Sequence, residues 1–147
     1  MPNATPNKIP EPRIPPGELP LKFSFKHLDL ESAKFHVSKC SKDYLYKLFA
    51  ILRKFSTWRV EEFTDENNDE HRHWIHFPDT SEQLGFQNIP NVDSDQFGYE
   101  SGYQFGVYPE VAWNRYRAHG ILIDDTFFLV WLDPDHLLFP NAPAAIE

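Results

Sequence analysis

The chain has 147 residues, of which 41% are hydrophobic and 16% aromatic, enough apolar material for one domain with a substantial core. A formal net charge of −8 makes it a poor non-specific binder of nucleic acid. The single cysteine, Cys40, excludes an intrachain disulfide, and no apolar run approaches the ~20 residues of a transmembrane helix. Because the N-terminus lacks a hydrophobic signal core, we expect a cytoplasmic protein without a membrane partner.

The charge is distributed unevenly along the chain. Residues 21–57 carry eight Lys and Arg against three acids, whereas residues 58–104 carry two Arg against eleven acids. Two interpretations stay open. The asymmetry reflects either a solvated Lys-rich helix and an acidic loop, or a basic and an acidic binding surface.

The first 20 residues hold seven of the thirteen prolines, which predicts an extended Pro-rich arm. Residues 21–147 are then expected to form a single domain. Leu21, Phe23 and Phe25 alternate with polar residues, and this alternation predicts a half-buried strand over residues 21–26.

A helix is predicted over residues 42–55. Ser41 is a favourable N-cap, and the apolar residues that follow recur at three- and four-residue spacing. Ser56 or Thr57 can cap a second, short helix over residues 58–63, so the two form a helical hairpin.

The sequence HRHWIHF at residues 71–77 predicts a strand in which His71, His73, Ile75 and Phe77 share one face. Residues 79–102 contain glycines and a proline without a sustained period, which indicates a long irregular connection. A further strand is predicted at residues 103–107, where large apolar residues alternate.

Residues 115–136 contain the most apolar run in the chain, residues 126–132. Two strand-forming runs flank Asp124 and Asp125, which is the spacing of a two-residue β-hairpin. Residues 127–132 do not alternate in polarity, so we expect a central strand that is buried on both faces. The fold class predicted overall is α+β, a small, mostly antiparallel sheet with a helical hairpin packed on one face.

The open end of this hairpin carries the most suggestive side chains. Arg117 and His119 lie on one face of a strand, and pairing back from the turn sets Arg117 opposite Leu132 and His119 opposite Val130. Asp133 and His136 follow directly. An arginine that holds a phosphate and a histidine that moves protons are what phosphodiester cleavage requires. The alternative is structural: Arg117 pairs with Asp133, and His136 caps the strand end.

Three histidines, His71, His73 and His76, raise the question of a zinc site. His71 and His73 share a strand face, but His76 points to the other side and no cysteine accompanies them. We therefore expect no metal site and no cofactor.

The order strand, helical hairpin, strand and terminal antiparallel set is similar to the RelE/ParE-like toxin superfamily. In particular, YRAHGILIDDTFFLVWLDPDHLLF at residues 116–139 resembles the C-terminal stretch of those toxins, and it also resembles small uncharacterised bacterial proteins of mobile-element and defence neighbourhoods. The resemblance implies an mRNA endoribonuclease that acts on RNA, free or on the ribosome, and is neutralised by an antitoxin.

Residue roles carried over from that family make Arg117, His119 and His136 the catalytic candidates. Arg115, His73 and Asp133 are the substrate-binding candidates. A second hypothesis is a non-catalytic inhibitor or regulator, in which the acidic residues 58–104 dock a basic protein partner by mimicking the charge of nucleic acid.

Overall fold

The computed structural model describes residues 14–66, 71–86, 101–107 and 115–140. These residues form a five-stranded sheet, two α-helices and three 3₁₀ helices. In chain order the elements are η2 (Pro16–Glu18), β1 (Lys22–Ser24), η3 (Val37–Lys39), α1 (Lys42–Phe55), α2 (Val60–Phe63), β2 (His73–Trp74), η4 (Phe77–Asp79), β3 (Gly102–Gly106), β4 (Arg117–Ile123) and β5 (Thr126–Asp133).

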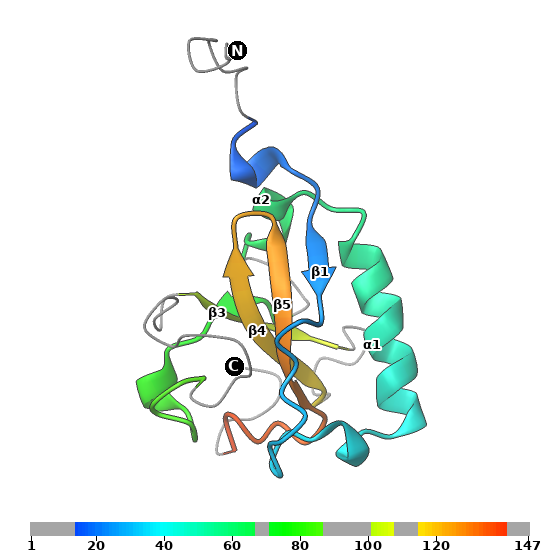
Figure 1. Cartoon of the computed structure of the whole chain (residues 1–147), viewed down its shortest axis with the longest axis vertical. Helices are drawn as coiled ribbons and strands as arrows, with labels where there is room; N and C mark the ends of the chain where they lie inside the picture. Colours follow the sequence, from blue (N-terminus) through cyan, green and yellow to red (C-terminus); the bar gives the residue numbers. More distant parts are fainter. Residues whose placement is uncertain (1–13, 67–70, 87–100, 108–114, 141–147) are drawn as a thin grey trace, which may run out of the picture.

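The strands lie in the order β1-β5-β4-β3-β2. Strands β2, β3, β4 and β5 each pair antiparallel with their neighbours in this series. Strand β1 pairs in parallel with β5, with Lys22 opposite Thr126. Figure 1 shows β5 between β1 and β4 near the middle of the molecule. The predicted α+β class, with a small and mostly antiparallel sheet, is confirmed.

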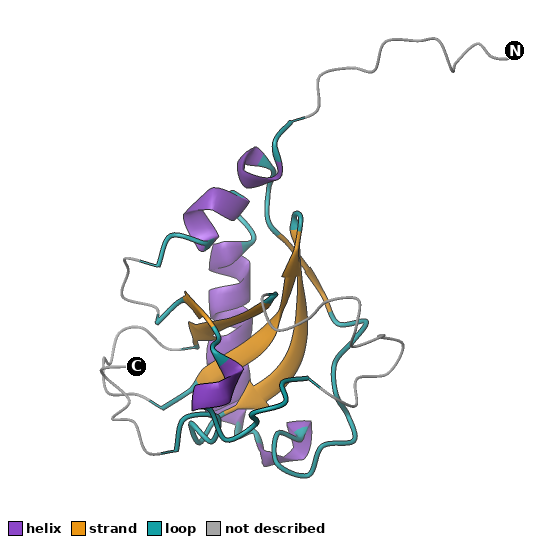
Figure 2. Ribbon diagram, turned by 90° about the vertical axis from the view of Figure 1, so that its left-hand side faces the viewer, coloured by secondary structure: helices purple, strands orange, loops and turns teal. Residues whose placement is uncertain are grey.

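Helix α1 forms where the sequence predicts it. The Ser41 hydroxyl accepts a hydrogen bond from the Tyr44 amide at 3.0 Å, which satisfies one of the free donors of the first turn. The helix buries one side in the larger core cluster, together with α2 and the aromatic residues of β3 and β5. Figure 2 shows α1 behind the sheet and the segment around η4 in front of it.

The opposite face of the sheet is covered mainly by irregular chain. A second core cluster gathers there around Trp131, which stacks on Phe35 at a ring distance of 4.5 Å and meets the edge of Phe86. Asp29 ties the covering segment down, because its carboxylate accepts a hydrogen bond from the Trp131 indole at 3.1 Å. Strand β5 is thus buried on both faces, as its unbroken apolar run predicts.

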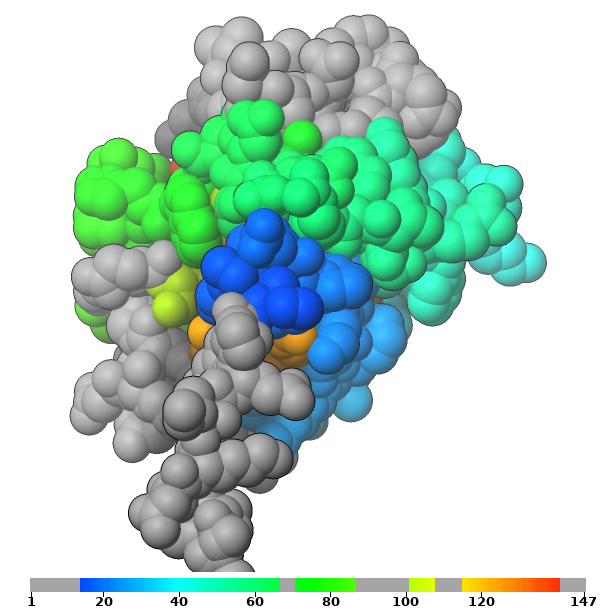
Figure 3. Space-filling model, turned by 90° about the horizontal axis from the view of Figure 1, so that it is seen from above, coloured from blue at the N-terminus to red at the C-terminus, as the bar shows by residue number. Residues whose placement is uncertain are grey.

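The described part of the predicted arm, residues 14–20, lies against the rest of the domain. The Val60 amide donates to the carbonyl oxygen of Leu19, and Pro20 forms a β-bridge with Arg59. Figure 3 shows this N-terminal segment in contact with the region of α2. The strand that follows is shorter than predicted and ends at Ser24, so Phe25 is exposed rather than half-buried. Residues 1–13 lie outside the described residues.

The strand predicted at residues 71–77 contracts to His73–Trp74. His71 has a φ of 54°, which breaks the extended backbone, and η4 begins at Phe77. The predicted division of faces holds for Ile75 and Phe77, which enter the second cluster, and for Trp74, which packs on Tyr103 on the helix side. Most of the predicted irregular connection, residues 87–100, is outside the described residues.

The hairpin turns at Asp124 and Asp125 as predicted, with Asp124 in the left-handed region at φ 54°. Its register is the predicted one from the turn to Ile121, which pairs with Phe128. Beyond Gly120 the prediction is wrong by one residue: His119 pairs with Trp131 instead of Val130, and Arg117 with Asp133 instead of Leu132.

A β-bulge causes this shift, because Val130 is an extra residue between the partners of Gly120 and His119. Its carbonyl oxygen accepts a hydrogen bond from the Asp29 amide at 3.0 Å. The bulge also exchanges the faces of the strand beyond it. Leu132 turns into the cluster beneath α1, and Asp133 shares the opposite face with His119.

In the part of the chain that the structure describes, no helix has the length and apolar character that a membrane span requires.

Candidate functional site

The candidate site is built around a buried histidine–aspartate pair on the face of the sheet away from α1. Nε2 of His119 donates to Oδ2 of Asp133 at 3.0 Å, and both side chains are almost wholly excluded from solvent. Phe35 and Trp131 meet the imidazole edge-on. Nδ1 of His119 is buried and has no hydrogen-bond partner among the described residues.

The Asp133 carboxylate also organises the chain that follows β5. Oδ1 accepts the amide of Leu137 at 2.7 Å, and Oδ2 accepts the amide of Leu138 at 3.0 Å. Burial by itself would raise the pKa of Asp133. The hydrogen bond and charge of His119, together with the two amides, outweigh burial and hold that pKa below its ordinary value.

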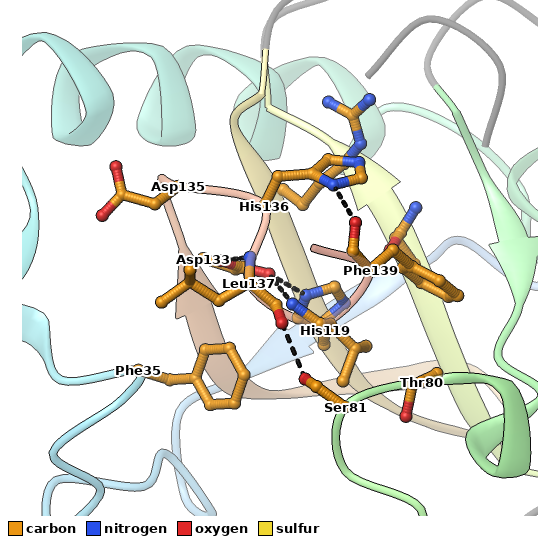
Figure 4. Close-up of polar contacts among 12 residues, drawn as sticks. Phe35, Thr80, Ser81, His119, Asp133, Asp135, His136, Leu137 and Phe139 are labelled. Carbon is orange, nitrogen blue, oxygen red and sulfur yellow. Dashed lines mark hydrogen bonds and ion pairs between the residues drawn. The ribbon is translucent and has the colours of Figure 1, made fainter. Parts of the chain in front are cut away.

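Residues 134–140, here called the C-terminal cap, fold back over this pair (Figure 4). His136 makes the bend with a φ of 61°, and its Nδ1 donates to the carbonyl oxygen of Phe139 at 2.9 Å. Ser81 fastens the cap from outside: its amide donates to the carbonyl oxygen of Leu138 and its hydroxyl to that of Leu137. In the structural alternative His136 caps the strand end; in the structure His136 instead holds the bend, and Asp133 accepts the amides that follow β5.

The two arginine candidates lie in different environments. Arg117 is opposite Asp133 in the ladder, is buried, and donates from its guanidinium to the carbonyl oxygen of Tyr116 at 3.0 Å. Its own carbonyl oxygen accepts a hydrogen bond from the hydroxyl of Tyr44, which connects β4 to α1. Arg115 precedes the strand and is exposed.

His73 joins the same face of the sheet through Gln104. The register sets His73 opposite Gln104, and Gln104 opposite His119. An amide nitrogen only donates, so Nε2 of His73 accepts from Gln104 at 2.9 Å and Nδ1 donates to the carbonyl oxygen of Trp74. Both ring nitrogens of this substrate-binding candidate are thereby occupied within the protein.

The other histidines considered for a metal are directed elsewhere. His76 bonds to Asp79 at 2.8 Å on the surface, and the backbone of His71 turns away from the strand. Among the described residues, no three His, Cys, Asp or Glu side chains are placed to share a metal ion.

One part of this site, Gln104, was missed by sequence reasoning, and Cys40 lies beside the site. Gln104 lies in a strand predicted only from its large apolar neighbours, although a glutamine between them is the signal that could have drawn attention. Cys40 lies near the carboxylates of Asp133 and Asp135, and burial followed by these two charges raises the pKa of its thiol to about 11. A thiol in such surroundings is a poor nucleophile.

Comparison of the chain with models of known protein families, with curated proteins and with solved structures found no match.

Arg117, His119 and Asp133 lie together at the open end of the hairpin, as the sequence predicts, and His136 lies in the cap over them (Figure 4). It leaves Arg115 at the surface and connects His73 through Gln104. A histidine oriented by a carboxylate is a chemically competent base. In this structure His119 and Asp133 contact other side chains and backbone amides of the same chain, and the pair positions the C-terminal cap.

Proposed function

We propose that this chain is a non-catalytic protein-binding domain whose acidic surface docks a basic partner. The observation that carries the proposal is the burial of the catalytic candidates. The exposed fraction is 1% for Arg117 and 0% for both His119 and His136. A catalytic base or phosphate ligand has to come within hydrogen-bond distance of its substrate.

The hydrogen bonds of these residues support the same conclusion. Asp133 holds His119 and two backbone amides at once, and His136 closes the cap through Phe139. Each bond provides a partner for a buried polar group, and leaving such a group without a partner would cost about 1–3 kcal/mol. These bonds give the side chains a structural purpose; Nδ1 of His119 is a buried atom that they leave without a partner among the described residues.

The acidic surface lies around α2. Its described members that face solvent are Glu61, Glu62, Asp65 and Glu66. Of the two arginines in residues 58–104, Arg59 pairs with Glu61 and Glu62. Arg72 is buried and donates to the carbonyl oxygens of Glu62 and Phe63. The surface thus carries a net negative charge, which favours a basic partner through electrostatic complementarity.

A binding measurement tests this proposal, with a short Lys/Arg-rich peptide as the probe and the full chain as the receptor. We expect the double variant Asp65→Lys/Glu66→Lys to bind at least about tenfold more weakly than the wild type, and added salt to weaken the wild-type complex. The matched control is Glu31→Lys/Asp135→Lys, which changes the net charge equally at other exposed acids. Equal loss in both double variants would reject a localised docking surface.

A RelE-like endoribonuclease is the second candidate, and one specific arrangement favours it: the hydrogen-bonded His119–Asp133 pair with Arg117 opposite Asp133 on the neighbouring strand. Cleavage would require the C-terminal cap to move away from the sheet. Purified wild type is incubated with single-stranded RNA, and growth is followed after induction of the wild type and of Arg117→Ala/His136→Ala. If the wild type cleaves RNA and is toxic, and the double variant is neither, the ribonuclease replaces the binding proposal. If expression of the wild type is harmless and the RNA stays intact, the ribonuclease is rejected.

A further inference from the structure

Helix α1 exposes two aromatic and two cationic side chains on the side that faces solvent. Its buried side packs Tyr44, Leu48 and Phe55 against the sheet. Its opposite side carries Lys42, Tyr46, Phe49 and Arg53, all exposed. We call these four residues the α1 stripe. In Figure 1, α1 stands at the edge of the molecule beside the sheet.

The four residues follow one another at spacings of four, three and four. At 3.6 residues per turn this spacing keeps them within roughly 60° of arc, on one straight line about 17 Å long. The same alternation of three and four defines the contact seam of paired helices. A second helix can therefore lie along the stripe and meet all four side chains.

The centre of the stripe is aromatic and open to solvent. Tyr46 is 74% exposed and Phe49 is 62% exposed, although both are large hydrophobic residues. Single exposed apolar side chains are ordinary on a protein surface, whereas a contiguous patch of neighbouring ones, especially one with a polar rim, marks an interaction site. Tyr46 and Phe49 are such neighbours, since residues three apart adjoin on a helix.

The ends of the stripe are cationic. Neither Lys42 nor Arg53 forms an ion pair with any of the described residues. The other two cations of the helix are engaged inside the domain: Lys47 bonds to Asp43 at 2.9 Å, and Lys54 lies over the ring of Trp58. Lys42 and Arg53 thus stand at the two ends of the exposed aromatic pair without an acidic partner among the described residues.

We propose that the α1 stripe docks an acidic amphipathic helix of a partner protein. Apolar side chains of that helix cover Tyr46 and Phe49, and carboxylates at its two ends meet Lys42 and Arg53. This surface is distinct from the acidic surface around α2, and the proposal does not depend on the function assigned to that surface.

The charges argue against two other occupants. If a second copy of this chain bound with its α1 antiparallel, Lys42 of each copy would face Arg53 of the other. If the two helices were parallel, each of these cations would face its own counterpart. In both cases like charges in contact oppose pairing. A single-stranded nucleic acid needs a groove of many cations, whereas the stripe offers two on a chain of net charge −8.

The test uses a synthetic helical peptide with leucine at the seam positions and glutamate at both ends, and the full chain as its receptor. We expect Tyr46→Ala/Phe49→Ala to bind at least about tenfold more weakly than the wild type, because both apolar contacts are lost. The matched control is Phe25→Ala/Leu84→Ala, which removes two other large apolar side chains that are more than half exposed. Its affinity should equal that of the wild type, and circular dichroism verifies that all variants fold.

A charge exchange tests the ends of the stripe. Lys42→Glu/Arg53→Glu should lose about fivefold in affinity for the glutamate peptide and regain it with a lysine-ended peptide. The proposal fails if the wild type does not bind, or if the aromatic and control variants bind equally. It also fails if wild-type self-association is abolished by Tyr46→Ala, or if a single-stranded oligonucleotide binds the stripe more tightly than the peptide does.

Discussion

The two faces of the central sheet are stabilised in different ways. The face beneath α1 is packed with rings, and Phe63 alone meets five of them. The opposite face carries Gln104, Arg117, His119 and Asp133, which are buried as completely as the apolar residues around them. Burial of apolar area stabilises both faces, and the second face depends in addition on the hydrogen bonds of its buried polar groups.

This difference predicts different responses to mutation. Apolar cores tolerate substitutions that conserve volume, because the hydrophobic effect has no direction. A buried hydrogen-bond network fails when one member is lost, since the partner left behind stays desolvated. The four substitutions below compare the two faces, from the largest expected effect to the smallest.

Phe63→Ala on the helix side should have the largest effect. Removing a ring at the centre of the aromatic cluster leaves a cavity, and the free energy of unfolding should fall by about 4 kcal/mol. Urea denaturation followed by tryptophan fluorescence measures it. Leu84→Ala, at an exposed leucine, serves as the control and should change the stability little. Equal losses in the two variants would mean that the cluster is not the core.

Asp133→Asn on the other side keeps the size of the side chain and removes its charge. It should lower the free energy of unfolding by about 3 kcal/mol, because His119 and two amides share this carboxylate. The loss should also depend on pH. The folded pKa of Asp133 is depressed, so its contribution is complete above the unfolded value of about 3.9 and disappears as pH falls through the folded value.

The measurement is therefore a pair of urea titrations, for the wild type and Asp133→Asn, repeated downward from about pH 6 through the carboxylate range. Asp43, Glu62 and Asp125 also have lowered pKa values, but they are present in both proteins and cancel in the difference. A difference in stability that stays constant with pH would show that the charge of Asp133 does not stabilise the fold.

Gly120→Ala tests the close approach of β4 and β5 beside the bulge. A Cβ at Gly120 would lie 2.2 Å from the carbonyl oxygen of Phe128 and 2.6 Å from the ring of Phe127. We expect a loss of about 2 kcal/mol from this overpacking. At Gly17 the nearest atom would be 3.5 Å away, so thermal unfolding of Gly17→Ala should match the wild type. An unchanged midpoint for Gly120→Ala would contradict the close approach.

Tyr44→Phe should have the smallest effect of the four. It removes the hydroxyl that donates to the carbonyl oxygen of Arg117 at 2.8 Å and leaves the packing of the ring intact. A loss of about 1 kcal/mol is expected for one buried hydrogen bond. Tyr46→Phe removes an exposed hydroxyl from the same helix, so a stability difference between the two variants measures this bond.

The regular elements of the fold follow from local signals. The Ser41 cap and the spacing of apolar residues predict α1 to the residue, and the unbroken apolar run predicts β5 as a strand buried on both sides. The alternation across residues 71–77 predicts the faces correctly but not the length, since His71 leaves the extended conformation. Phe25 is exposed because β1 ends at Ser24, and where β1 ends depends on its pairing with β5, far away in the chain.

The composition of the candidate site was predictable, but its burial was not. Pairing from the turn brings Arg117, His119 and Asp133 to one end of the hairpin. The bulge at Val130, which sets Asp133 on the same face as His119, carries no local signal, because Val130 lies within a uniformly apolar run. The C-terminal cap depends on Asp133 accepting two amides and on Ser81 from a distant segment. Such contacts arise only in three dimensions.

The parallel pairing of β1 with β5 constrains the order in which the molecule assembles. Lys22 and Thr126 are neighbours in space, although about a hundred residues separate them, and closing such a long loop slows folding. During synthesis, β1 and α1 emerge well before β5, the strand that lies between β1 and β4. Until β5 arrives, the apolar sides of α1 and β1 lack their main partner and are exposed to aggregation.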